Sequence, residues 1–118
     1  MYVENLSDLR RKVLRHFGSR AIYYSTSRYD APGVSESGEV RFLLYDSFVF
    51  GFGIMEPPYT SLSIFLDFGG DIAATRVLGK ELTFIENEET DLRDAFEVVN
   101  QYCRLRLPDR FLEAYDAL

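Results

Sequence analysis

The chain has 118 residues, of which 47% are hydrophobic, 15% aromatic and 27% charged, and its formal net charge at pH 7 is −6. Proteins that bind nucleic acids need a basic surface to displace counterions from phosphates, so this acidic balance argues against a nucleic-acid partner. A chain of this length is expected to form one domain, an α+β domain over residues 1–118. The lone Cys103 rules out a disulfide within the chain, and no apolar run approaches the roughly 18 residues that span a bilayer. We therefore expect a reducing, cytoplasmic compartment and no membrane partner.

Residues 1–17 are predicted to form a helix, because an apolar stripe repeats there at spacings of three and four. The stripe consists of Leu6, Leu9, Val13 and Phe17. Asn5 or Ser7 can cap its first turn, and Gly18 can end it. The outer surface of this helix is basic and has two interpretations, a solvated face or an anion-binding patch. It carries Arg10, Arg11, Lys12 and Arg15.

A first strand is expected at residues 20–27, RAIYYSTS, which are rich in strand-forming side chains. Residues 29–38, YDAPGVSESG, have the Pro, Gly and Ser content of a solvated loop. Loops carry function disproportionately, so this segment is a candidate for contact with a partner.

Residues 40–54, VRFLLYDSFVFGFGI, predict a central β-hairpin with Asp46-Ser47 as a two-residue loop. This loop would set three pairs on one side of the sheet, Tyr45 with Phe48, Leu43 with Phe50 and Arg41 with Phe52. It would set three others on the opposite side, Leu44 with Val49, Phe42 with Gly51 and Val40 with Gly53. Both sides are apolar, so the hairpin belongs in the middle of a sheet.

Strict alternation in residues 61–68, SLSIFLDF, predicts a further strand with one buried and one mixed face. Ser63, Phe65 and Asp67 would lie on the mixed face. Gly69-Gly70 predicts a hairpin turn, so residues 71–77 should return antiparallel, with a short helix as the competing interpretation. A last brief strand is expected at residues 82–85.

The acidic stretch 86–94 leads into a helix whose apolar stripe runs from Leu92 to Cys103, with Thr90 or Asp91 as its cap. Cys103 lies on this stripe and should be a buried thiol. Pro108 should end the helix and open a short terminal one. The order helix, antiparallel meander of five to six strands, then helices predicts an α+β sandwich in which the N- and C-terminal helices pack on one face of the sheet. The opposite face would then be exposed.

No motif in the chain points to catalysis or to a cofactor. His16 is the only histidine, which excludes a histidine-based triad or a multi-histidine metal site within the chain. Gly51 and Gly53 lack the third glycine and the helix start of a dinucleotide-binding turn. The sequence therefore favours a non-enzymatic binding protein without a metal or cofactor, whose aromatic residues supply contact area.

Two segments carry a resemblance to a known class of proteins. NQYCRLRLPDRFLEAYDAL, at 100–118, closes a meander that contains SIFLDFGGDIAATRVLG, at 63–79. Together they resemble bacterial immunity proteins of polymorphic toxins, in particular the immunity factors of NAD-hydrolysing necrotizing toxins of actinobacteria. The resemblance implies an antitoxin that occludes the active site of a cognate toxin, which would be basic around that site. From the loops and the mixed strand face we select Tyr29, Asp30, Glu36, Glu56, Tyr59 and Asp67 as partner-binding residues.

Two other functions stay open at this stage. A secretion-chaperone-like module would dimerise through a helix or an apolar sheet face. A small-ligand-binding or enzymatic α+β domain would enclose a pocket. If the hairpin's aromatic side is the contact surface, Phe50→Asp should abolish partner binding and leave the fold intact, whereas loss of helical circular dichroism would identify that side as core.

Overall fold

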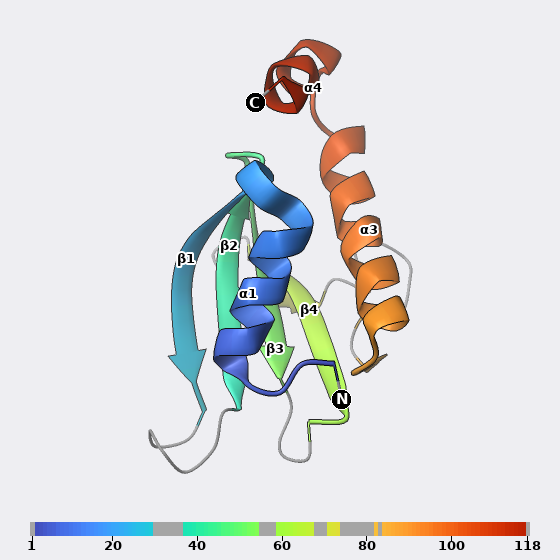
Figure 1. The fold of residues 1–118 in the computed structure, drawn as a ribbon. Helices are drawn as coiled ribbons and strands as arrows, with labels where there is room; N and C mark the ends of the chain where they lie inside the picture. Colours follow the sequence, from blue (N-terminus) through green and yellow to red (C-terminus); the bar gives the residue numbers. More distant parts are fainter. Residues whose placement is uncertain are drawn as a thin grey trace.

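The computed structural model describes residues 2–29, 37–54, 59–67, 71–73, 82 and 84–117. The elements follow in the order α1 (Leu6–Phe17), a 3-10 turn (Gly18–Arg20), β1 (Ala21–Arg28), β2 (Gly38–Leu44), β3 (Phe48–Ile54), β4 (Ser61–Asp67), β5 (Asp71–Ala73), β6 (Ile85–Glu86), α3 (Glu89–Leu105) and α4 (Asp109–Asp116). The antiparallel sheet has the order β1-β2-β3-β4-β5, and β6 also pairs with β4. Figure 1 shows α1 and α3 in front of this sheet, so the predicted α+β sandwich is confirmed.

Asn5, one of the two predicted caps, is the N-cap of the first helix, which therefore begins at Leu6 and not at residue 1. The Asn5 side chain accepts a hydrogen bond of 2.8 Å from the backbone N–H of Asp8, which fixes the first turn. Gly18 ends the helix with a φ of 60°, a left-handed conformation that glycine adopts at little cost. Asp8 is buried, and burial alone would raise its pKa, but hydrogen bonds from Lys12 and Arg11 outweigh that effect and lower it.

The long C-terminal helix α3 follows the predicted stripe but not the predicted cap. Its N-cap is Glu88, whose side chain makes no capping hydrogen bond, so Thr90 and Asp91 lie inside the first turn instead of before it. Acidic side chains in that turn still interact favourably with the helix dipole. Cys103 is fully buried, as predicted, and burial raises the pKa of its thiol to about 12.

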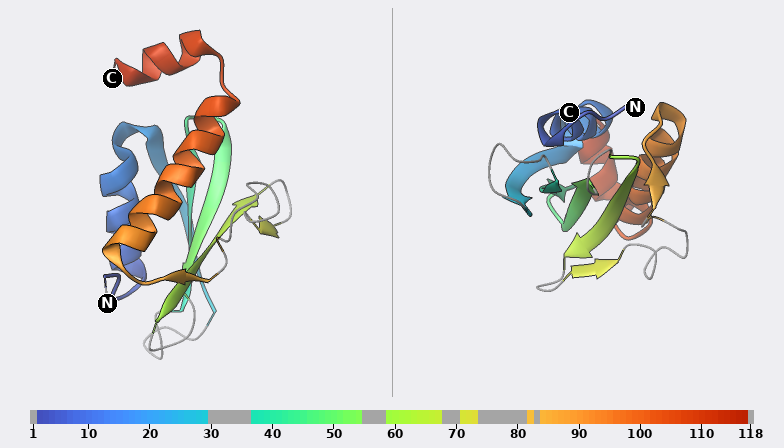
Figure 2. Two further views of the ribbon diagram at one scale, coloured as in Figure 1. Left: turned by 90° about the vertical axis from the view of Figure 1, so that its right-hand side faces the viewer. Right: turned by 90° about the horizontal axis from the view of Figure 1, so that it is seen from below.

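The core lies between the sheet and the two long helices (Figure 2). Phe52 is at its centre, because the Phe52 ring contacts Phe17 of α1 and Phe96 of α3 at centroid distances of 6.4 Å and 5.5 Å. Phe50 packs against Tyr102 of α3 at 5.8 Å and is fully buried. The aromatic side of the hairpin is therefore core, and the idea that Phe50 belongs to an exposed contact surface is wrong.

The register of the central hairpin differs from the prediction by one residue. The loop has three residues, 45–47, and the structure pairs Leu44 with Phe48 and Phe42 with Phe50. Tyr45 adopts a φ of 54° and turns out of the strand, and its buried hydroxyl donates a 2.5 Å hydrogen bond to Asn100. A shift of one residue exchanges the faces of the hairpin, so Gly51 lies opposite Arg41 and not Phe42.

The strands predicted at 20–27, 61–68 and 71–77 are confirmed within the described residues, and the last predicted strand is displaced. β4 alternates as expected, with Leu62, Ile64 and Leu66 buried. Residues 71–73 return antiparallel to it as β5, and residues 74–77 lie outside the described part of the chain. The last short strand occupies Ile85–Glu86, slightly later than predicted.

Asn87 joins three segments of the chain behind this last strand. Its side-chain amide donates hydrogen bonds to the carbonyl oxygens of Val3 (2.7 Å) and Tyr59 (2.8 Å). Its Oδ1 accepts a 2.7 Å hydrogen bond from the Val3 N–H, and Asn87 is only 2% exposed. One side chain thus fixes the N-terminal segment beside the start of α3.

The last helix, α4, lies at the end of the sheet above the β2–β3 turn (Figure 1). Its Tyr115 ring packs on Tyr45 at a centroid distance of 5.3 Å, and Leu112 is buried. Asp116 accepts two hydrogen bonds from Arg104, at 3.0 Å and 3.1 Å, and one of 3.2 Å from Arg20. Pro108 precedes the helix, as predicted.

The α4 contact is expected to weaken in acid. The hydrogen bonds from Arg104 and Arg20 lower the pKa of Asp116 from 3.8 to about 2. Because the folded pKa is depressed, the pairing stabilises docking above the ordinary pKa and is lost as the pH falls through about 2. The protection of the α4 amides, measured by NMR as the ratio of the intrinsic to the observed exchange rate, should therefore fall over this window in the wild type. In Asp116→Asn the protection should already be lower than in the wild type at neutral pH; a wild-type α4 whose protection stays unchanged down to pH 2 contradicts the assignment.

Candidate functional site: the open face of the sheet

The side of the sheet that faces away from α1 and α3 is the candidate site, and we call it the open face (Figure 2). The strand registers arrange its side chains in rows that cross the sheet from β1 to β4. The first row is Ile22, Leu43, Val49 and Asp67. The second row is Ser25, Arg41, Gly51 and Phe65. The third row is Ser27, Glu39, Gly53 and Ser63.

Arg41 holds two carboxylates together on this face. Its guanidinium forms ion pairs with Glu39 at 2.5 Å and with Asp67 at 2.8 Å. All three side chains are largely buried by their neighbours, which strengthens the pairing and fixes its geometry. Among the described residues, this cluster of three side chains has two carboxylates and one cation, so the three groups together carry a formal negative charge.

Tyr29 extends this cluster from the end of β1. Its hydroxyl donates a 3.1 Å hydrogen bond to the second oxygen of Glu39, while 60% of the residue stays exposed. The tyrosine therefore offers an aromatic surface beside the cluster, and aromatic side chains are enriched in protein interfaces.

Gly51 allows a close contact across the middle row. An added Cβ at Gly51 would lie 2.0 Å from the Phe65 ring, so only glycine leaves room for that ring against β3. The Arg41 guanidinium lies over the Phe65 ring, with its Cζ atom 4.8 Å from the ring centroid. The Phe65 ring thus fills the space beside Gly51.

The first row adds an apolar surface next to the charged cluster. Ile22 is 52% exposed, and Leu43 and Val49 are half-buried beside it. Exposed apolar side chains in a row gain free energy when a partner covers them, at about 25 cal/mol per Å² of apolar area. The open face thus combines an apolar strip with a rigid, negative centre.

The structure brings together some of the sequence-predicted site residues. Tyr29 and Asp67 both belong to the cluster around Arg41. Tyr59 packs against the core instead, and its carbonyl accepts the hydrogen bond from Asn87. Asp30, Glu36 and Glu56 lie outside the described residues.

Sequence reasoning did not select Glu39 or Arg41 as site residues, although both carry charge in the central hairpin. The signal was their spacing of two, which places them on one face of a strand. That face could be identified with the face of Asp67 only with the correct register of β2 against β3.

In the described part of the chain, no group of three or more His, Cys, Asp or Glu side chains could hold a metal ion. Helices of the length and apolarity needed to cross a membrane are also absent from those residues. Comparisons with protein-family models, curated proteins and solved structures found no match to this chain.

Proposed function

We propose that the chain is an immunity-type inhibitor, which binds a toxic protein of its own host through the open face and blocks access to the toxin's active site. The observation that carries this proposal is the union of an apolar strip with the negative cluster of Glu39, Arg41 and Asp67 on a sheet face that neither α1 nor α3 covers. An inhibitor of this kind acts by occupying a surface and needs no reacting groups of its own.

The charge of the chain supports a basic partner. The net charge of −6 attracts cations over the whole surface, and the cluster adds a local excess of negative charge. A lysine or arginine at the mouth of the toxin's active site would be attracted to the carboxylates of Glu39 and Asp67 on this face. Such complementarity raises the association rate and fixes the register of the complex.

A capture experiment with matched variants tests the proposal. The tagged chain is used to capture proteins from the native host, beside Ile22→Glu on the open face and Leu105→Glu on α3. Both replaced side chains are exposed, at 52% and 79%, so neither change should unfold the chain. We expect Ile22→Glu to lose the partner, because the substitution removes an apolar contact and places a carboxylate in the apolar strip, where the partner would have to desolvate it. Leu105→Glu should retain the partner.

The captured protein is then expressed in a laboratory bacterium. The proposal expects growth arrest, relief of that arrest by co-expression of the wild-type chain or Leu105→Glu, and no relief by Ile22→Glu. A captured protein without toxicity, equal rescue by both variants, or a chain that pairs only with a second copy of itself through the open face would each overturn it.

A further inference from the structure

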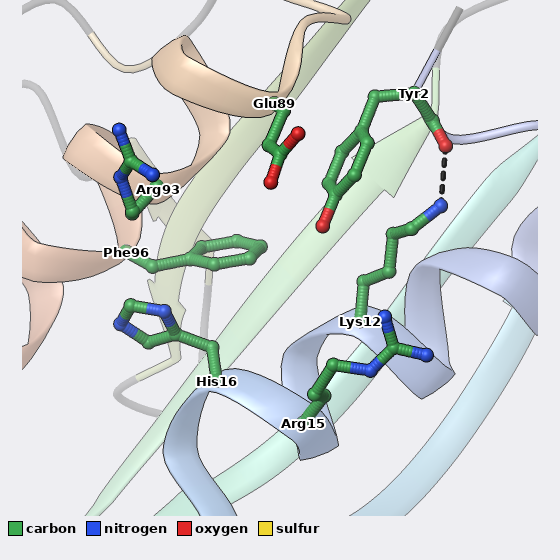
Figure 3. A pocket seen from close by; sticks show the side chains of 7 residues that line it. All are labelled: Tyr2, Lys12, Arg15, His16, Glu89, Arg93 and Phe96. Atoms are coloured by element: carbon green, nitrogen blue, oxygen red, sulfur yellow. Dashed lines mark hydrogen bonds between the residues drawn. The ribbon is translucent and has the colours of Figure 1, made fainter.

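A groove lies on the helix side of the molecule, between α1 and α3. This groove has a volume of about 320 Å³. Its lining is Tyr2, Lys12, Arg15, His16, Glu89, Arg93 and Phe96. Figure 3 shows the side chains of α1 on one side of the groove, those of α3 on the other, and the Tyr2 ring closing one end.

The groove is positive although the chain is acidic. Lys12, Arg15 and Arg93 contribute three cations to the lining, and Glu89 contributes the one carboxylate. Within the described residues, Arg15 and Arg93 are exposed and take part in none of the ion pairs or hydrogen bonds. Their side chains come from opposite walls of the groove, with the Phe96 and His16 rings between them (Figure 3).

Lys12 is held in place at the groove. Its ammonium donates hydrogen bonds to the Tyr2 carbonyl and, at 2.9 Å, to Asp8, and it lies 4.0 Å from the centroid of the Tyr2 ring. An ammonium has three N–H donors, so one remains for a ligand. Its fixed position lowers the entropy cost of that contact.

In a neighbouring hollow between α1, α3 and α4, the arginines are already paired with carboxylates of the protein. It shares His16 with the groove and contains Arg20 and Arg104. There both arginines already bind Asp116, and His16 contacts Glu97 at 2.9 Å. The protein's own carboxylates pair with the arginines in that hollow, whereas in the groove Lys12 is paired with Asp8 and the guanidinium groups of Arg15 and Arg93 pair with no carboxylate of the described residues.

We propose that the groove between α1 and α3 binds the phosphate group of a small ligand. Guanidinium groups match the geometry of phosphate oxygens, and the excess of cations in the lining favours an anionic group in the groove. A water molecule occupies about 30 Å³ in the liquid, so the groove has room for a phosphate and a few further atoms. Glu89 repels a bare anion but accepts hydrogen bonds from hydroxyl groups, which favours a hydroxyl-bearing phosphate ester over free phosphate.

An NMR titration of the full chain tests this site with inorganic phosphate, glycerol 3-phosphate and, at equal ionic strength, sodium chloride. We expect saturable shifts at the backbone amides of Lys12, Arg15 and Arg93 with both phosphates and only weak, linear shifts with chloride. Arg93→Gln and Arg15→Gln should each weaken binding about tenfold, because each removes a charge-assisted hydrogen bond. Arg110→Gln, on the exposed side of α4, is the matched control and should bind as the wild type does.

The two probes distinguish the source of the phosphate. Tighter binding of glycerol 3-phosphate assigns the groove to an ester, and equal binding of both probes assigns it to the phosphate group alone. Glu89→Gln should tighten inorganic phosphate in either case, because it removes a like charge. Shifts that do not saturate, or affinities that Arg93→Gln and Arg110→Gln lower equally, would overturn the proposal.

Discussion

Phe50→Asp is expected to unfold the chain. Phe50 is fully buried, and its ring packs against Tyr102 of α3. Truncation of a buried phenylalanine to alanine already costs about 3–5 kcal/mol, and a buried carboxylate without a partner adds a desolvation penalty. The sum is comparable with the whole stability of a small domain, about 5–15 kcal/mol. Circular dichroism at 222 nm should therefore show the loss of both long helices.

Phe50→Leu is the matched control, because it keeps an apolar side chain at the same position. It should retain the helical signal and lower the urea midpoint only moderately. A folded Phe50→Asp variant that merely loses its partner would contradict the placement of the hairpin's aromatic side in the core.

Asn87→Ala should be the most destabilising polar-to-alanine change among the described residues. The substitution removes three hydrogen bonds and leaves the buried N–H of Val3 without an acceptor. Each unsatisfied buried group costs about 1–3 kcal/mol, so we expect a loss of about 3 kcal/mol or more in the free energy of unfolding. Urea denaturation followed by circular dichroism measures this loss.

Asn87→Asp separates the two halves of that network. It keeps an acceptor for the Val3 N–H but has no amide donor for the carbonyls of Val3 and Tyr59. Fast amide exchange should then appear in the N-terminal segment ahead of the sheet. If Asn87→Ala has the same urea midpoint as the wild type, the side chain does not join these segments in solution.

Much of the fold follows from local patterns in the sequence. The alternation in β4 correctly placed Phe65 and Asp67 on the face opposite Leu66, because a strand has a side-chain period of two. The apolar stripe with Gly18 after it gave the end of α1. These signals depend only on neighbouring residues, so they can be read without a structure.

The hairpin register could not be derived in this way. A tyrosine and an aspartate that both adopt positive φ, at 54° and 52°, are an uncommon choice for a turn. Tertiary contacts outweigh that preference here, because Tyr45 is buried and bonds to Asn100, more than fifty residues later in the chain. A long-range contact thus sets the loop length, and the loop length decides which face carries Arg41.

The candidate site depends on the same residue shift. With the correct register, Arg41 lies between Glu39 and Asp67, and the helix-covered face keeps the large aromatic rings. The contact surface is consequently less aromatic and more polar than the composition suggested. Many of the chain's phenylalanines build the core, and the proposed interface uses Ile22, Tyr29 and Phe65 at its margins and centre.

Hydroxyl-radical footprinting of the chain, alone and in complex with the protein captured from its host, tests the role of the open face most directly. The side chains of Ile22, Leu43 and Phe65 should lose reactivity in the complex, while the exposed Leu105 and Phe84 keep theirs. Protection confined to Leu105 or Phe84, with Ile22 and Phe65 as reactive as in the free chain, would contradict the account.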